Sequence, residues 1–258
     1  MSDFLVMING VPVPAGATAQ VALDHGLVGG GGVFEGLRSY RRRLRDPAAH
    51  LDRMERSAAG VGLRFPRALL AEELTRFAGL TGAEDAAIRA ILTRSGQRIL
   101  REEPLANPTG PWRLAPVEHR ISPLLIGAKT LSYAANMQAA RVAAAAGADA
   151  PLLVRADDRA VLEGHIFSVC WLEGERVVFP TLATGILDSL TRRLVIEAVE
   201  GGLERDTPLD DLADADGALC LSTVIESRPV SEILGVGTYD PASRRLGEVR
   251  AALAEITR

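Results

Sequence analysis

Apolar residues recur at helical spacing in several stretches of the chain. In residues 50–63 four of them fall on one helical face, namely Leu51, Met54, Ala58 and Val61. Gly60 and Gly62 mark the end of this predicted helix. A second amphipathic pattern covers residues 66–80 and opens with a proline, which the first turn of a helix tolerates. Three more helices are predicted over residues 133–148, 187–202 and 243–256.

Short apolar runs bounded by turn residues predict β-strands. Residues 4–13 are apolar around Asn9-Gly10, which is the strongest short-range signal for a hairpin. Residues 86–94 and 112–120 are expected to be strands, separated by a Gly/Pro/Asn-rich loop at 102–111. Further strands are predicted at 151–156, 160–164, 166–172, 176–180, 217–222 and 227–233.

These elements predict an α+β fold with two domains. The second half has many short strands and few helices, which favours a barrel-like α/β domain beside a smaller N-terminal α/β domain. A chain of 258 residues also suits two domains better than one compact core. We expect the small domain at residues 1–118, a linker at 119–126 and the C-terminal domain at 127–258.

Composition and charge exclude several classes of protein. The net charge of -4 provides no basic field for binding nucleic acid. The sequence shows neither a signal peptide nor an apolar run long enough to span a membrane, so we expect a cytoplasmic protein. Cys170 and Cys220 lie in apolar runs and are expected to be buried thiols in a reducing compartment. The four histidines have no metal-ligand spacing, so no metal is expected.

Lysine is used only once. The chain has 29 lysine and arginine residues in total, and Lys129 is the single lysine among them. A surface cation can be lysine or arginine with little penalty, whereas only lysine can lose its proton near neutral pH and attack a carbonyl carbon. Lys129 is therefore either a chance survivor in an arginine-rich chain or a nucleophile.

Three other segments could bind an anion or bring the backbone close to a partner. Gly29 to Gly32 form either a flexible turn or a stretch where the backbone approaches a ligand or another chain closely. Leu190 and Thr191 begin a predicted helix capped by Asp188 or Ser189, and unpaired N–H groups at a helix start bind phosphate well. Ser222 and Thr223 lie in a predicted turn whose hydroxyl and N–H groups could hold a phosphate or a carboxylate.

Two charged residues complete the candidate chemistry. Arg53, on the first helix, could be the bidentate partner of the same anion. Glu163 follows an apolar strand and precedes a glycine, so its side chain either enters a cleft or lies in solvent. A buried carboxylate needs a cationic or proton-bearing partner, and a pyridinium nitrogen would be one.

Six ordered motifs together resemble one family. The segments DHGLVGGGGVFEGLRSY, HLDRM, KTLSYAANM, VLEGHIF, GILDSLTRR and STVIESRPV are similar in order and spacing to the class IV, or fold type IV, pyridoxal-phosphate aminotransferases. That family includes branched-chain aminotransferases, D-amino acid aminotransferases and aminodeoxychorismate lyases. The resemblance extends from about Met7 to Ile233, and it implies a two-domain fold type IV enzyme with pyridoxal 5'-phosphate as cofactor.

The resemblance also implies roles for individual residues. Lys129 would bind the cofactor covalently and move the proton, and Glu163 would keep the pyridine nitrogen protonated. The 5'-phosphate would be bound by the N–H groups of Leu190 and Thr191, the Thr191 hydroxyl and, in addition, Arg53, Ser222 and Thr223. Family members are typically homodimers, so we expect a homodimer with the glycine-rich stretch near its interface.

The substrate site is expected from the same motifs. Arg38 matches an arginine near the mouth of the site, and Thr223 and Val224 would present N–H groups to the substrate carboxylate. Arg94 or Arg98 would contact that carboxylate in a D-amino acid or lyase-like pocket. Phe34 stands where D-amino acid enzymes usually have tyrosine, and Tyr133 lies four residues after the lysine.

Choosing between family members leaves alternatives open. VFEGLRSY looks most like the branched-chain enzymes, and Gly36 stands where lyases often place a proton-relaying threonine. The chain length is closer to the lyases. The largest departure is His165 to Phe167, where the family commonly has small hydroxyl residues and an asparagine, and this bulk is expected to narrow the cofactor face or reshape the pocket.

We therefore expect an aminotransferase that acts on an amino acid and a 2-oxo acid, with a branched-chain-like substrate. The alternatives are an aminodeoxychorismate lyase that releases pyruvate and 4-aminobenzoate, or a non-catalytic relative that keeps only the fold. The presence of Lys129, Glu163, Arg53 and Thr191 argues against the last of these.

Overall fold

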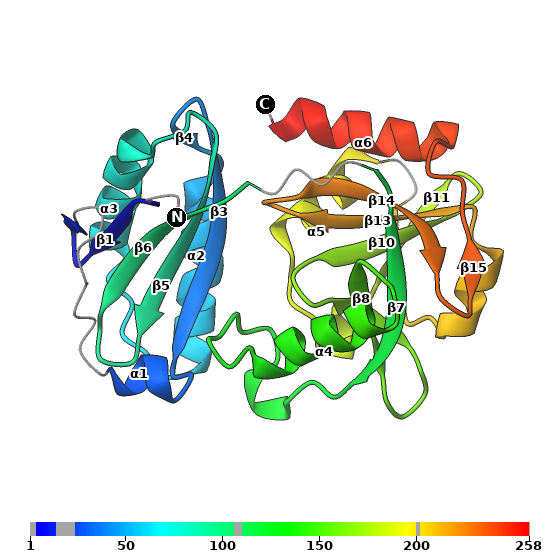
Figure 1. The fold of residues 1–258 in the computed structure, drawn as a ribbon, viewed down its shortest axis with the longest axis horizontal. Helices are drawn as coiled ribbons and strands as arrows, with labels where there is room; N and C mark the ends of the chain where they lie inside the picture. Colours follow the sequence, from blue (N-terminus) through cyan, green and yellow to red (C-terminus); the bar gives the residue numbers. More distant parts are fainter. Residues whose placement is uncertain (1–3, 14–23, 106–109, 200–201, 258) are drawn as a thin grey trace. The chain divides into compact units, whose positions relative to one another are not determined.

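The computed structural model describes residues 4–13, 24–105, 110–199 and 202–257, and its contacts divide the chain into two units (Figure 1). Unit 1 comprises Met1–Ala106 and Gly127–Tyr133, and unit 2 comprises Asn107–Ile126 and Ala134–Arg258. These bounds differ from those expected from the sequence. Residues 112–119 form a strand of unit 2, whereas residues 127–133 return to unit 1.

Unit 1 is an antiparallel sheet with strand order β2-β1-β6-β5-β3-β4, packed against two helices (Figure 1). Its strands are β1 (Val6–Ile8), β2 (Val11–Val13), β3 (Gly32–Tyr40), β4 (Arg43–Leu44), β5 (Ala86–Thr93) and β6 (Arg98–Glu103). Its helices are the short α1 (His25–Val28) and the longer α2 (Pro47–Gly60) and α3 (Arg67–Leu80).

Local sequence explains most of these elements. Asn9 and Gly10 have φ values of 50° and 81°, as the predicted two-residue hairpin between β1 and β2 requires. Helix α2 begins with a proline after Asp46, whose side chain accepts the N–H of Ala49 at 3.2 Å. The predicted helices at α2 and α3 are confirmed.

Strand β3 divides its side chains between the two faces of the sheet. Val33 and Leu37 pack into the core with side chains of α2 and α3, such as Met54 and Leu70. Because side chains alternate along a strand, Phe34 lies on the opposite face, where the guanidinium of Arg89 stacks on its ring at 4.8 Å. One face of this sheet therefore forms the core, and the other presents Phe34.

Unit 2 is a curled sheet with strand order β12-β11-β10-β13-β14-β7-β8-β9, and β15 pairs with β14. Strand β9, at one end of this order, contacts β10, which makes the sheet barrel-like. The strands are β7 (Trp112–His119), β8 (Ala150–Arg155), β9 (Val161–Gly164), β10 (Ser168–Glu173), β11 (Arg176–Pro180), β12 (Gly202–Arg205), β13 (Gly217–Ser222), β14 (Glu226–Ile233) and β15 (Gly237–Thr238).

Helices cover this sheet. Helix α4 (Ala134–Ala145) packs on β7 and β8, and α5 (Leu190–Ala198) and α6 (Arg244–Thr257) pack on each other and on β13 (Figure 1). Short 3-10 helices occur at η1 (Pro123–Leu125), η2 (Leu182–Thr184) and η3 (Leu209–Asp214). The predicted α+β architecture with a barrel-like second domain is confirmed.

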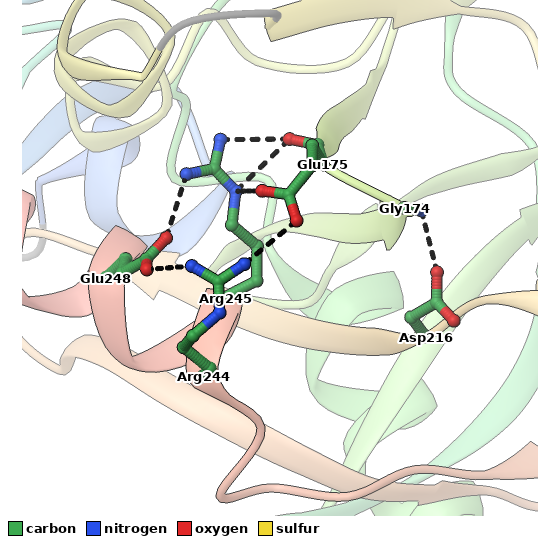
Figure 2. A network of polar contacts seen from close by, with 6 residues as sticks. All are labelled: Gly174, Glu175, Asp216, Arg244, Arg245 and Glu248. Atoms are coloured by element: carbon green, nitrogen blue, oxygen red, sulfur yellow. Dashed lines mark hydrogen bonds and ion pairs between the residues drawn. The ribbon is translucent and has the colours of Figure 1, made fainter.

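Polar contacts attach α6 to the turn between β10 and β11 (Figure 2). Arg245 donates to the carbonyl of Glu175 at 2.9 and 3.1 Å, and Arg244 donates to the Glu175 carboxylate at 2.9 Å. Asp216 accepts the N–H of Gly174 at 2.7 Å in the same turn. Arg244 and Glu175 are largely exposed, so the ion pair between them contributes little to stability.

Several elements were not predicted from the sequence. Strand β6 lies between β1 and β5 in the sheet, and the sequence had indicated no strand there. The predicted loop at 102–111 overlaps only its last two residues. Strand β3, which has nine residues, was missed as well. Strands β4, β12 and β15 were also missed, and they are at most four residues long. Part of the predicted 102–111 loop, residues 106–109, lies outside the described residues.

Candidate functional site

Lys129 lies in a strand-like segment that pairs with β3 in unit 1. The Lys129 carbonyl accepts the N–H of Phe34 at 3.0 Å, and the N–H of Leu131 donates to Gly32 at 2.9 Å. The N–H of Lys129 itself donates to the hydroxyl of Ser57 on α2 at 3.0 Å. Both backbone groups of Lys129 are thus held by residues distant in the sequence.

The glycine-rich stretch lets this segment approach. A Cβ on Gly32 would lie 2.6 Å from Cδ1 of Leu131 and 2.7 Å from the carbonyl of Leu92, which real side chains do not tolerate. At Gly30, φ is 67° and the hydroxyl of Ser132 would lie 3.1 Å from an added Cβ. The structure therefore shows a close approach within the chain itself, which was not among the alternatives expected from the sequence.

Aromatic side chains surround the end of the Lys129 side chain. Its Nζ lies 4.5 Å from the ring centroid of Phe34 and 5.8 Å from that of Tyr133. The two rings meet edge to face, with centroids 5.2 Å apart. Phe34 is buried and Tyr133 is half-buried, so they form an apolar wall beside the amine.

Arg53 is held by a buried carboxylate that sequence reasoning missed. Glu35, on β3, accepts from Nε and Nη2 of Arg53 at 2.7 Å each, and from Nδ1 of His50 at 2.8 Å. Burial alone would raise the pKa of Glu35, but the charge and hydrogen bonds of Arg53, with the contribution of His50, outweigh it and lower the pKa to about 2. The ionised carboxylate can only accept, so Nδ1 of His50 carries the proton.

A signal for this cluster does exist in the sequence. His50, Arg53 and Ser57 recur at helical spacing beside the apolar face of α2, where buried polar residues need partners. The chain provides Glu35 at a buried position of β3, three residues after Gly32. The pattern indicates that such partners exist, but only the packing of α2 on β3 identifies them.

Glu163 lies near the loop that leads to α5 in unit 2. It is half-buried on β9, and its Oε1 accepts the N–H of Leu187 at 3.4 Å. The effect of His165 to Phe167 on the cofactor face or the substrate pocket stays a prediction. Phe167 is buried in the core against Trp112 and folds over Gly164, where any side chain would collide with its ring. Ile166 is exposed.

Helix α5 provides the candidate anion site. Ser189 caps it by accepting the N–H of Arg192 at 3.3 Å, while Asp188 pairs with Arg193, so the open choice of cap is resolved for Ser189. The first two residues of the helix, Leu190 and Thr191, are buried. Their N–H groups belong to the first turn, which has no helical acceptors.

The second predicted turn follows β13, on which α5 packs. Ser222 ends the strand, and its hydroxyl accepts the N–H of Ile225 at 3.2 Å, which closes a turn containing Thr223 and Val224. All of these residues are half-buried. Unit 2 therefore carries Glu163, the start of α5 and this turn.

The candidate arginines of unit 1 have different surroundings. Arg38 is buried on β3 and stacks on the ring of Tyr40 at 4.9 Å. Arg94 is exposed in the turn after β5, and its N–H donates to Gly31 at 2.9 Å. Arg98 forms a forked pair with Glu73 of α3 at 2.8 to 3.0 Å, which commits its guanidinium to the fold. We therefore leave Arg98 out of the proposed substrate site.

The sequence-based expectations also concerned the two cysteines, metal-binding clusters and membrane-spanning helices. Cys170 and Cys220 are buried free thiols, as predicted, and burial raises the pKa of Cys170 to about 12. The described residues contain no cluster of three or more metal-binding side chains. Among the same residues, no helix has the length and apolar character needed to cross a membrane.

Comparison with known proteins gives a consistent result. Residues 32–233 match the family described as Amino-transferase class IV. The chain is 29% identical to an aminodeoxychorismate lyase of Bacillus subtilis, over 96% of this chain and 92% of that protein. It is also 29% identical to a protein of Methanocaldococcus jannaschii that is provisionally named a branched-chain-amino-acid aminotransferase, over 97% and 94% of the two chains.

Solved structures agree on the fold. A fold IV-transaminase from Curtobacterium pusillum superposes with a TM-score of 0.86 and 25% identity, covering 99% of both chains. A hypothetical aminotransferase from Mycobacterium tuberculosis, in a PLP-bound form, superposes with a TM-score of 0.85 and 24% identity, covering 98% of both.

The side chains of this protein suit pyridoxal phosphate (PLP). Pyridoxal phosphate has an aldehyde, a pyridine nitrogen and a phosphate, which call for an amine, a carboxylate and anion-binding donors respectively. The chain has one lysine, placed beside an aromatic wall, the half-buried Glu163, and the oriented guanidinium of Arg53. The chain therefore belongs to the class IV aminotransferase family and is a pyridoxal-phosphate-dependent enzyme.

Proposed function

We propose that the protein is an aminotransferase that exchanges an amino group between an amino acid with a branched apolar side chain and a 2-oxo acid such as 2-oxoglutarate. The observation that carries this proposal is the wall of Phe34 and Tyr133 beside Nζ of Lys129. An aromatic wall favours an aliphatic side chain over the anionic ring of a chorismate-derived substrate.

Lys129 is the residue that performs the chemistry in this proposal. Its amine would hold the cofactor covalently and, once displaced by the amine of the substrate, would take the proton from the substrate Cα, two tasks that a guanidinium cannot perform. When bound, the cofactor supplies an electron sink for the substrate. Glu163 keeps the pyridine nitrogen protonated, since an ionised carboxylate stabilises a neighbouring positive charge.

The proposed phosphate ligands are one cationic side chain, one helix start and one turn. The cationic side chain is Arg53, whose guanidinium is oriented by Glu35. The helix start offers the N–H groups of Leu190 and Thr191 with the Thr191 hydroxyl, and the turn offers the hydroxyls of Ser222 and Thr223. A cationic fork together with a helix N-terminus meets the requirement of a dianionic phosphate.

The remaining residues of the proposal bind substrate. Arg38 and Arg94 are candidates to meet the carboxylate at the mouth of the site, and the turn at Thr223 and Val224 offers N–H groups to it. Phe34 and Tyr133 contact the apolar side chain of the substrate. A homodimer in the cytoplasm also stays a prediction, which the mass in solution and the cellular location would test.

Absorbance of the protein loaded with pyridoxal phosphate tests the proposal. We expect leucine, isoleucine or valine to convert the visible band of the lysine-bound cofactor into the near-ultraviolet band of its amine form, and 2-oxoglutarate to restore it. The lyase, which the Bacillus subtilis relative represents, predicts a visible band that no amino acid converts, and pyruvate release from aminodeoxychorismate. Complete absence of the visible band would contradict both functions.

A further inference from the structure

Ser57 joins the candidate lysine to the candidate phosphate-binding arginine. Its hydroxyl accepts the N–H of Lys129 at 3.0 Å and donates to the carbonyl of Arg53 at 2.9 Å. Ser57 is only 1% exposed and lies one helical turn after Arg53 on α2. One side chain therefore bridges two functional segments that are 76 residues apart in the sequence (Lys129 minus Arg53).

The direction of the two hydrogen bonds is fixed. A hydroxyl has one proton, and the Arg53 carbonyl can only accept it, so the lone pairs of the oxygen face Lys129. The side chain thus bonds back to its own helix and forward to Lys129 at the same time. Alanine at this position would leave the partly buried N–H of Lys129 without this acceptor.

The bridge determines where the Lys129 side chain begins. Ser57 fixes the peptide plane before the Cα of Lys129, and the bond from Phe34 to the Lys129 carbonyl fixes the plane after it. Together the two planes set φ and ψ, and hence the direction of the Cα–Cβ bond. An amine that must meet a bound aldehyde depends on this direction, since a misplacement of about 1 Å can cost on the order of 100-fold in rate.

We propose that Ser57 is a positioning residue, which sets the direction of Lys129 relative to Arg53 so that the amine captures a phosphate-bearing aldehyde quickly. The inference rests on the proposed roles of Lys129 and Arg53. It assigns to Ser57 no contact with the cofactor or the substrate.

The test is the rate of covalent capture. The apo protein is mixed with pyridoxal phosphate, and the visible band of the lysine-bound cofactor is followed in time. Reduction with borohydride and mass analysis then identify the modified residue. We expect Ser57→Ala to slow capture by about tenfold. The concentration of inorganic phosphate that halves the rate of capture is expected to remain within about twofold of the wild-type value, because Glu35 still holds Arg53.

Ser39→Ala is the matched control. Ser39 is a fully buried serine of the same unit, and its hydroxyl bonds the backbone of Ala86 at 3.2 and 3.4 Å without touching Lys129. The Ser39→Ala variant is expected to lose about as much thermal stability as Ser57→Ala but to capture the cofactor at the wild-type rate. Ser57→Cys serves as the second variant if Ser57→Ala does not fold. Its side chain has a similar volume to serine, but a thiol forms only weak hydrogen bonds.

Each outcome decides the matter. Slow capture in the Ser57 variant with normal capture in Ser39→Ala supports the inference. Equal rates in wild type and the Ser57 variants, or equal slowing in both serine variants, overturn it while leaving the proposed function intact. If the wild type forms no visible band, or if Lys129→Arg captures the cofactor as wild type does, the proposed function fails first.

Discussion

Both carboxylate oxygens of Glu35 accept hydrogen bonds from Arg53, at 2.7 Å from Nε and 2.7 Å from Nη2. The two side chains are 1% and 7% exposed, so this is a buried, bidentate ion pair. The fork defines the plane of the guanidinium, and His50 hydrogen-bonds the same carboxylate from the preceding turn of α2. Arg53 is thus presented in a single orientation to the anion that it is proposed to bind.

Replacing Glu35 by glutamine should weaken both stability and cofactor binding. Removing one member of a buried ion pair leaves the other charge uncompensated, so we expect a loss of about 3 kcal/mol in the free energy of unfolding. Affinity for pyridoxal phosphate should fall by about tenfold, while affinity for pyridoxal, which lacks the phosphate, should be unchanged. Urea unfolding and fluorescence titration of the apo protein measure the two effects.

Glu103→Gln is the control for this experiment. Glu103 accepts from Nε and Nη2 of Arg89 at 2.7 and 3.0 Å, which is the same fork, but the side chains of Arg89 and Glu103 are 35% and 26% exposed. Exposed pairs contribute about 1 kcal/mol or less. If the two variants lost equal stability, burial would not be what makes the Glu35 pair important.

Acid should destabilise the protein through the same pair. The pKa of Glu35 is lowered from 4.5 to about 2 in the folded state. As the pH falls, the Glu35 carboxylate therefore takes up a proton at a higher pH in the unfolded chain than in the folded protein. The stabilisation is complete above about pH 4.5 and is lost as the pH falls towards 2. Urea titrations from about pH 6 to about pH 3 should show this loss in wild type and a smaller one in Glu35→Gln. Parallel curves for the two proteins would contradict the assignment.

Glu163→Gln should separate binding from turnover. A neutral amide cannot hold a proton on the pyridine nitrogen, so the rate of amino-group transfer should fall by about tenfold or more while the cofactor stays bound. Stopped-flow absorbance with a single amino donor measures the rate, and equilibrium dialysis measures the binding. Glu118→Gln, at an exposed position of β7, is expected to change neither. Unchanged transfer in Glu163→Gln would make Glu163 a structural residue.

Gly32→Ala should displace the lysine segment. The new Cβ would collide with Leu131 and with the carbonyl of Leu92, so we expect a loss of about 1–3 kcal/mol and slower cofactor capture. Gly79→Ala is the matched control, because no atom lies within 4 Å of its added Cβ in α3 and alanine favours a helix. Equal effects of the two substitutions would show that space at Gly32 is not limiting.

Local chemistry determined much of this protein from the sequence alone. Helices α2 and α3 and the hairpin at Asn9-Gly10 follow from periodicity and turn residues, which act within a few positions of the chain. The single lysine and the spacing of six motifs were sufficient to indicate the family that residues 32–233 confirm.

Tertiary structure decided what depends on distant partners. Strand β6 was missed because its charged residues resemble a loop, whereas in the fold Arg98 pairs with Glu73 and Glu103 with Arg89. The segment at Lys129 joined unit 1 because its hydrogen-bond partners lie at Gly32, Phe34 and Ser57. Burial of polar groups requires such partners, and a linear sequence shows which residues need them but not where the chain supplies them.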